Sequence, residues 1–185
     1  TKTPFTKSLR RFHNQHRRGI RLLRERTIVS VRALFMTLSL IGVTLGAPGA
    51  ALANTLPAGA QVVSGDIQLQ HGGSALRVIQ GSQAAIVNWQ SFDIGHGALV
   101  DIVQPNVDAA LLSRVVGENL SQIHGSLNAN GHLYLINPNG ILFGADSQVN
   151  VHALIASTLD LADSDFLSGN LAFDGNSEAS VMTVS

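Results

Sequence analysis

The 185-residue sequence contains no cysteine, and only 13% of its residues are charged. Without cysteine no disulfide can form, so a folded state must be held by buried apolar surface and backbone hydrogen bonds. The main apolar run, Ala33 to Leu45, has thirteen residues, short of the roughly 18 to 20 that cross a bilayer as a helix. The sequence therefore predicts neither a disulfide framework nor a membrane-spanning helix.

The formal net charge of zero hides two oppositely charged parts. Thr1 to Arg32 hold ten Lys and Arg and one acid, which gives 10 − 1 = +9. Asn54 to Ser185 hold two arginines and eleven acids, which gives 2 − 11 = −9. A strongly acidic segment repels phosphate, so we expect no nucleic-acid partner.

The first part has the organisation of a signal peptide. A basic stretch is followed by the apolar run and then by Ala51-Leu52-Ala53, an A-x-A cleavage pattern. We therefore expect two regions: residues 1–53 as an extended signal peptide read by the Sec export machinery, and residues 54–185 as the exported domain. Cleavage after Ala53 would leave Asn54 as the first residue.

The exported part shows strand patterns and no long helical stripe. Short runs rich in Val, Ile and Leu are bounded by Gly, Asn, Asp or Pro: QVVSGDIQL, ALRVIQG, AAIVNW, LVDIVQ, HLYLI, ILF, VNVHALI and LAFDG. The segment VDAALLSRVV could form one or two helical turns. The pattern predicts an all-β domain, and strands of three to five residues with Asn-Gly corners favour a β-solenoid over a sandwich. At roughly 20 to 25 residues per coil, about six coils are expected.

The turn Asn137-Pro138-Asn139-Gly140 is the most specific short segment. An Asn at the first turn position can accept a hydrogen bond from the backbone two residues on, and Pro presets the next φ. Gly140 tolerates a left-handed conformation. An ordinary solenoid corner explains Pro138 and Gly140 better than it explains the two asparagines.

Several segments together resemble the amino-terminal secretion domain of the filamentous haemagglutinin family, the exoproteins of bacterial two-partner secretion. These segments are AAIVNWQSFDIG, QPNVDAALLSRV, SQIHGSLNANGHLYL, INPNGILFG and ASTLDL, in order from about Gly59 to about Leu161. The long basic leader is similar to the extended signal peptides of the family. The resemblance implies a right-handed parallel β-helix with an amino-terminal cap.

The resemblance also implies partners and site residues. A family member is recognised in the periplasm by a dedicated outer-membrane β-barrel transporter with POTRA domains. The family's secretion motif corresponds to Asn137, Pro138, Asn139, Gly140 and Ile141. A second family motif, Asn-Pro-Asn-Leu, is replaced by Gln104-Pro105-Asn106-Val107, and Ser113 stands where many relatives have Asn. These departures place the sequence near the high-molecular-weight adhesin branch and make Gln104, Pro105 and Asn106 only a possible secondary motif.

Catalytic patterns are lacking. There is no G-x-S-x-G elbow, no Gly-rich phosphate loop and no H-x-x-x-H pair. His71, His96, His124, His132 and His152 are spread singly, so each is expected at the surface or at a corner. Trp89 is expected in the core or the cap, and Arg77 and Arg114 either pair with local acids or face a partner. We expect no catalytic residue, no metal and no cofactor.

The favoured function is a non-enzymatic secretion module at the front of a large adhesin. The passenger would bind a host-cell or matrix receptor at the cell surface or outside a Gram-negative bacterium. Two alternatives stay open: the same module leading a contact-dependent growth inhibition toxin, and a β-helical carbohydrate-active enzyme whose acids align on successive coils.

Overall fold

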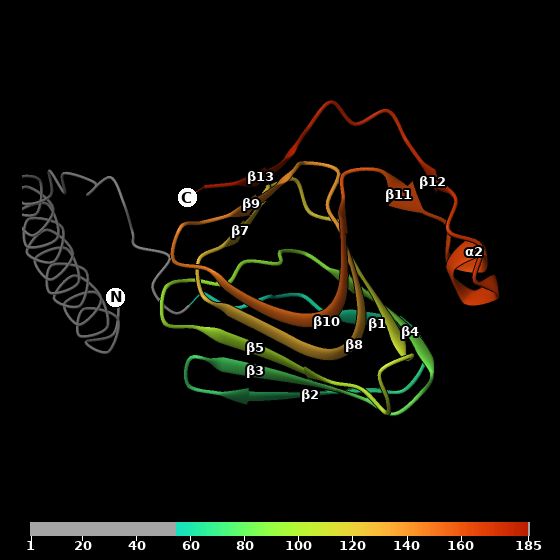
Figure 1. Cartoon of the computed structure of the whole chain (residues 1–185), viewed down its shortest axis with the longest axis horizontal. Helices are drawn as coiled ribbons and strands as arrows, with labels where there is room; N and C mark the ends of the chain where they lie inside the picture. The colour runs from blue at the N-terminus through green and yellow to red at the C-terminus, as the bar shows by residue number, and fades with distance from the viewer. Residues whose placement is uncertain (1–54, 185) are drawn as a thin grey trace, which may run out of the picture. The chain divides into compact units, whose positions relative to one another are not determined.

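The structure is a computed structural model, and it describes residues 55–184 (Figure 1). The predicted signal peptide and its cleavage site at Ala51, Ala53 and Asn54 lie outside these residues. Within the described range, no helix is both long and apolar enough to cross a membrane.

The described residues form many short strands, as the sequence predicts. The strands are β1 (Gln61–Ser64), β2 (Ile67–Gly72), β3 (Ala75–Gln80), β4 (Ala84–Trp89), β5 (Leu99–Val103), β6 (Ala110–Val115), β7 (Ser121–Ile123), β8 (Ser126–Ile136), β9 (Ile141–Phe143), β10 (Gln148–Ser157), β11 (Asp160–Leu161), β12 (Phe173–Asp174) and β13 (Val181–Thr183). A short helix, α2 (Asp163–Ser168), lies between β11 and β12.

Successive strands stack in parallel and wind into a β-helix with three faces (Figure 1). The first face contains β3, β5 and the first halves of β8 and β10. The second face contains β4, β6 and the second halves of β8 and β10. The third face contains β7, β9 and β13. The predicted all-β solenoid is confirmed.

The number of coils differs from the prediction. Ala75, Leu99, Ser126 and Gln148 occupy equivalent positions, so successive coils take 24, 27 and 22 residues. This spacing is close to the expected length, but the solenoid has about three turns, and the expectation of about six is wrong. The reason is that residues 55–74 and residues 158–180 form other structures instead of coils.

Residues 55–74 form the amino-terminal cap. β1 pairs antiparallel with β4, and β2 pairs antiparallel with β3. These antiparallel strands cover the first parallel coil, which would otherwise expose unpaired strand edges and open core. The cap that the family resemblance implies is therefore present.

The main core fills the space between the three faces. Its apolar side chains come from alternate strand positions, as expected for strands with one face inward. Trp89 is 1% exposed and makes an edge-to-face contact with Phe92, with ring centroids 5.6 Å apart. The expectation that Trp89 is a core or cap residue is confirmed.

A second apolar cluster lies on the outer side of the second face. Ile86, Leu112 and Tyr134 stand in register on β4, β6 and β8 and point away from the main core. Leu161 of β11 and Phe166 of α2 cover them. Residues 158–180 thus leave the solenoid and form a strap. The strap covers a column of apolar side chains that would otherwise be exposed to solvent on the outer side of the second face.

Candidate functional site

The candidate site is the corner between β8 and β9, where the predicted secretion motif lies. The amide of Gly140 donates to the carbonyl of Asn137 over 3.0 Å, which closes a β-turn. Asn137 Oδ1 accepts the Asn139 amide over 2.9 Å, as the sequence predicts for an Asn at this turn position. Gly140 has φ 109°, a conformation that residues with a Cβ rarely adopt.

Asn137 is buried, with 0% of its surface exposed. Its Nδ2 donates to the carbonyl of Asn119 over 2.9 Å and to Ser121 Oγ over 3.0 Å. Both acceptors belong to the preceding coil. The side chain therefore fastens one corner of the solenoid to the corner before it, and no partner molecule can reach it without opening the fold.

Asn139 and Pro138 are exposed. Asn139 Nδ2 donates to the carbonyl of Gly117 over 2.8 Å, and the Pro138 carbonyl accepts Ser177 Oγ over 2.6 Å. Hydrogen bonds to the preceding coil and to the segment that leads into β13 thus hold the corner in place. A partner can bind exposed side chains on a rigid backbone without a conformational change.

Ile141, the last residue of the predicted motif, belongs to the core. It is 0% exposed and stands in register with Ser121 on β7 and Val181 on β13. The five motif residues therefore divide into two sets: Asn137, Gly140 and Ile141 are buried, and Pro138 and Asn139 face outward.

Gln104, Pro105 and Asn106 form a similar corner between β5 and β6. Gln104 is 4% exposed, and its Nε2 donates to Gln80 Oε1 over 3.2 Å and to the Ala109 carbonyl over 2.9 Å. Asn106 Oδ1 accepts the Asp108 amide over 3.0 Å, the same local bond that Asn137 makes. This corner joins the first and second faces, whereas the Asn137 corner joins the second and third, so the structure does not bring the two motifs together.

Both arginines of the described range pair with local acids. Arg114 on β6 lies 2.7 Å from Asp160 and 2.8 Å from Asp163, and it also donates to the carbonyl of Leu161 over 2.5 Å. Partial burial by itself would lower the pKa of Arg114, but its hydrogen bonds to the two aspartates and their charges outweigh burial and raise the pKa. Arg77 pairs with Asp101 at 2.9 Å.

None of the five histidines in residues 55–184 is buried, but four of them lie in pairs that their positions in the sequence do not reveal. The rings of His96 and His124 stack with centroids 4.7 Å apart, and those of His132 and His152 stack at 5.8 Å. The paired histidines are 28 and 20 residues apart in the sequence. Parallel coils place such residues side by side, and a sequence without a strict repeat does not reveal the pairs. Among residues 55–184 no group of three His, Cys, Asp or Glu side chains could hold a metal ion.

Ser113 lies inside the solenoid. It is 0% exposed, stands in register with Val87 and Leu135, and its Oγ has no hydrogen-bond partner within the described chain. The Ser113 hydroxyl therefore makes no hydrogen bond to the corner at Asn137.

Known proteins are similar to this chain over much of its length. The family model described as "TPS secretion domain" matches residues 53–185. A heme/hemopexin-binding protein of Haemophilus influenzae strain Rd is 40% identical over 111 residues, which cover 60% of this chain and 12% of that protein. A second heme/hemopexin-binding protein of Haemophilus influenzae is 41% identical over 116 residues, covering 61% of this chain and again 12% of the relative.

A solved structure has a similar fold. The crystal structure of the HMW1 secretion domain from Haemophilus influenzae aligns with a TM-score of 0.66 and 32% identity, over 69% of this chain and 35% of that one. The chain thus spans about an eighth of the length of its curated relatives and about a third of the solved domain.

Proposed function

The chain belongs to the TPS secretion domain family, and from this membership we propose that residues 54–185 direct a longer exoprotein across the outer membrane of a Gram-negative bacterium. The proposed partner is a dedicated outer-membrane β-barrel transporter whose periplasmic POTRA domains receive the chain after Sec export. The family-model match over residues 53–185 carries this proposal.

We propose that the passenger beyond residue 185 binds a ligand at the cell surface or outside the cell. Both curated relatives have names that describe binding, and the chain covers 12% of each. The module itself is proposed to be non-enzymatic. A growth-inhibition toxin and a carbohydrate-active enzyme have no comparable support from the relatives.

The corner at residues 137–140 is the proposed recognition element. Its buried residues fix the backbone, and Pro138 and Asn139 present side chains that a transporter can contact without unfolding the solenoid. Arg77 and Arg114 are engaged in ion pairs, so charge attraction through free arginines is not needed in this scheme. Asn139 Nδ2 already donates to the Gly117 carbonyl and to Asn137 Oδ1, so the group that Asn139 offers to a transporter is the hydrogen-bond acceptor Oδ1.

The test is transporter-dependent release. The chain 1–185 is expressed in a Gram-negative host with and without the cognate transporter, and the amount in the culture medium is measured. We expect release only with the transporter, and retention in the periplasm without it. Equal release in both strains would overturn the proposed function.

A further inference from the structure

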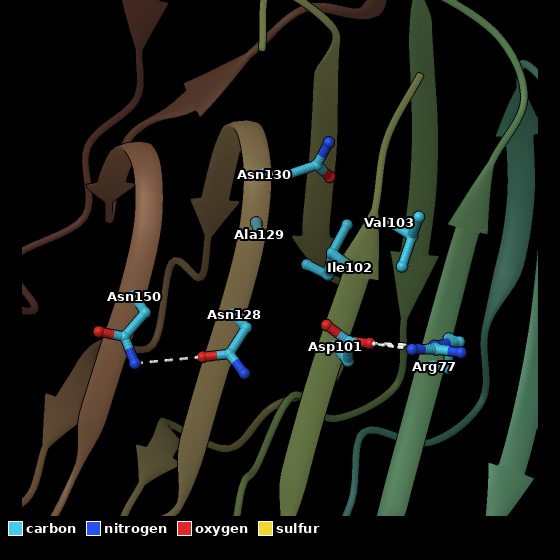
Figure 2. A pocket seen from close by; sticks show the side chains of 8 residues that line it. All are labelled: Arg77, Asp101, Ile102, Val103, Asn128, Ala129, Asn130 and Asn150. Carbon is cyan, nitrogen blue, oxygen red and sulfur yellow. Dashed lines mark hydrogen bonds and ion pairs between the residues drawn. The ribbon is translucent and has the colours of Figure 1, made fainter. Parts of the chain in front are cut away.

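A row of polar side chains crosses the outer side of the first face. Arg77 on β3, Asp101 on β5, Asn128 on β8 and Asn150 on β10 are register partners on four neighbouring parallel strands. Figure 2 shows the four side chains side by side across these strands. Neighbouring strands are about 4.8 Å apart, so the polar row is straight and evenly spaced.

The polar row is only partly satisfied by its own members. Arg77 bonds Asp101 Oδ2 through Nε and Nη2, and Asn150 Nδ2 donates to Asn128 Oδ1 over 3.3 Å (Figure 2). Four groups have no protein partner among residues 55–184: Arg77 Nη1, Asp101 Oδ1, Asn128 Nδ2 and Asn150 Oδ1. These groups alternate as donor, acceptor, donor, acceptor along the row.

Such alternation matches a particular ligand chemistry. A hydroxyl group both donates and accepts, so a line of hydroxyls can satisfy alternating donors and acceptors, whereas a phosphate or carboxylate only accepts. The ion pair between Arg77 and Asp101 also leaves the polar row without net charge. Both features favour a neutral polyhydroxylated ligand over an anion.

Apolar side chains flank the polar row. Ile79 and Val103 are register partners on one side, and Ala75 and Leu99 are register partners on the other. Val103 is 38% exposed. Together with the polar row, Val103 and the neighbouring backbone line an open hollow of about 420 Å³, within the usual size range of small-ligand sites.

We propose that this face binds a neutral, straight-chain oligosaccharide. The chain would lie across the strands with its hydroxyls on the polar row and the C–H surfaces of its rings against the flanking aliphatic side chains. This function is separate from transporter recognition, because the row and the Asn137 corner lie on different parts of the β-helix.

The test uses the secreted chain, purified from the medium, and two neutral straight-chain probes, cellohexaose and chitohexaose, with hexagalacturonate as the acidic comparison. Isothermal titration should show saturable binding of at least one neutral probe and none of hexagalacturonate. Asn128→Ala and Asn150→Ala should each weaken binding about tenfold, the equivalent of about 1.4 kcal/mol. Gln122→Ala is the matched control, because Gln122 is a partly exposed polar residue on the third face.

A second variant guards against a general effect on folding. Asp101→Asn removes the negative charge of the polar row but keeps an acceptor, so it should admit hexagalacturonate that the unaltered chain rejects. Absence of saturable binding of both neutral probes would overturn the proposal. Binding that is unchanged by both Asn variants, or that is lost equally in Gln122→Ala, would also overturn it and would leave the polar row as a purely structural ladder.

Discussion

Asn137 and Asn139 stand two positions apart in one turn, yet their side chains have different surroundings. The Asn137 amide is enclosed by the preceding coil, whereas that of Asn139 lies at the surface and donates to the Gly117 carbonyl and to Asn137 Oδ1. A buried amide is costly to remove because its former partners stay buried without replacements, while water can replace a lost partner at the surface. The same substitution should therefore affect folding at one position and a surface contact at the other.

We predict that Asn137→Ala lowers the free energy of unfolding by about 3 kcal/mol. The variant leaves the Asn119 carbonyl, Ser121 Oγ and the Asn139 amide without their present partner. Urea unfolding of the purified chain measures the change. Asn137→Asp is the informative companion, because it keeps the acceptor for the Asn139 amide but loses both Nδ2 bonds. An unfolding free energy within about 0.5 kcal/mol of the unaltered chain would contradict the structural role.

Ser113→Ala should have little effect on stability or secretion. Its hydroxyl is buried without a partner, and replacing an unsatisfied polar group by an apolar one of similar size is close to neutral or slightly stabilising. We expect a change in unfolding free energy of no more than about 1 kcal/mol and normal secretion. Loss of secretion in a stable Ser113→Ala protein would show that this position has a role in transport that its burial hides.

At the scale of elements, the strap at residues 158–180 depends on contacts with the solenoid. Phe166 packs edge-to-face on Tyr134 with ring centroids 5.4 Å apart, and Arg114 binds two acids of the strap. The Arg114 side chain is 14% exposed, whereas Asp160 is 54% exposed, so water screens part of this attraction. The ion pairs that raise the pKa of Arg114 stabilise the folded state fully at any pH below the pKa that Arg114 has in the unfolded chain. This contribution is lost only when strongly alkaline pH passes through the pKa of Arg114 in the folded state.

We predict that Arg114→Met loosens the strap without unfolding the solenoid. Hydrogen exchange at the Phe166 amide, which bonds the Ala162 carbonyl, should become faster by an amount equivalent to about 1 to 2 kcal/mol. Arg77→Met is the control, because it also removes an ion-paired arginine. That arginine is 55% exposed, and its partner Asp101 does not belong to the strap. The prediction fails if the exchange rate of the Phe166 amide is the same in both variants.

The strands that could be predicted from the sequence are those with long aliphatic runs. β3, β4 and β5 coincide with ALRVIQG, AAIVNW and LVDIVQ. β6 falls in VDAALLSRVV, which also allowed a helical turn, because both sides of β6 are buried and its pattern is not alternating. β9 has three residues and coincides with the fully apolar run ILF, whereas β7 (SQI) and β13 (VMT) are as short and include polar residues, so neither an apolar run nor a periodicity is visible.

The candidate site was predictable only in part, for a physical reason. The bond from the Asn139 amide to Asn137 Oδ1 joins residues two positions apart, so it follows from local turn chemistry. The burial of Asn137 depends on Asn119 and Ser121, which are 18 and 16 residues away. The polar row and the histidine pairs depend on coil lengths of 22 to 27 residues that no sequence repeat marks.

At the scale of the whole molecule, the chain combines a basic segment, residues 1–32, with an acidic segment, residues 54–185. Processing separates the two in our proposal. Because Ala51-Leu52-Ala53 follows the thirteen-residue apolar run, we predict that the exported protein begins at Asn54. Amino-terminal sequencing of the secreted chain tests this position. A stable exported form that retains Ala33 to Leu45 would contradict it.

The most direct test of the proposed recognition element is secretion of the Asn139→Ala chain, measured beside its stability. The chain is co-expressed with its cognate transporter, its amount in the medium is compared with that of the unaltered chain, and urea unfolding is measured on the same protein. We predict a loss of about 1 kcal/mol or less in unfolding free energy, because the two bonds from Asn139 Nδ2 belong to an exposed side chain whose partners water can reach, together with a strong loss of secretion. Normal secretion of Asn139→Ala would contradict the proposal and reduce residues 137–140 to a structural corner.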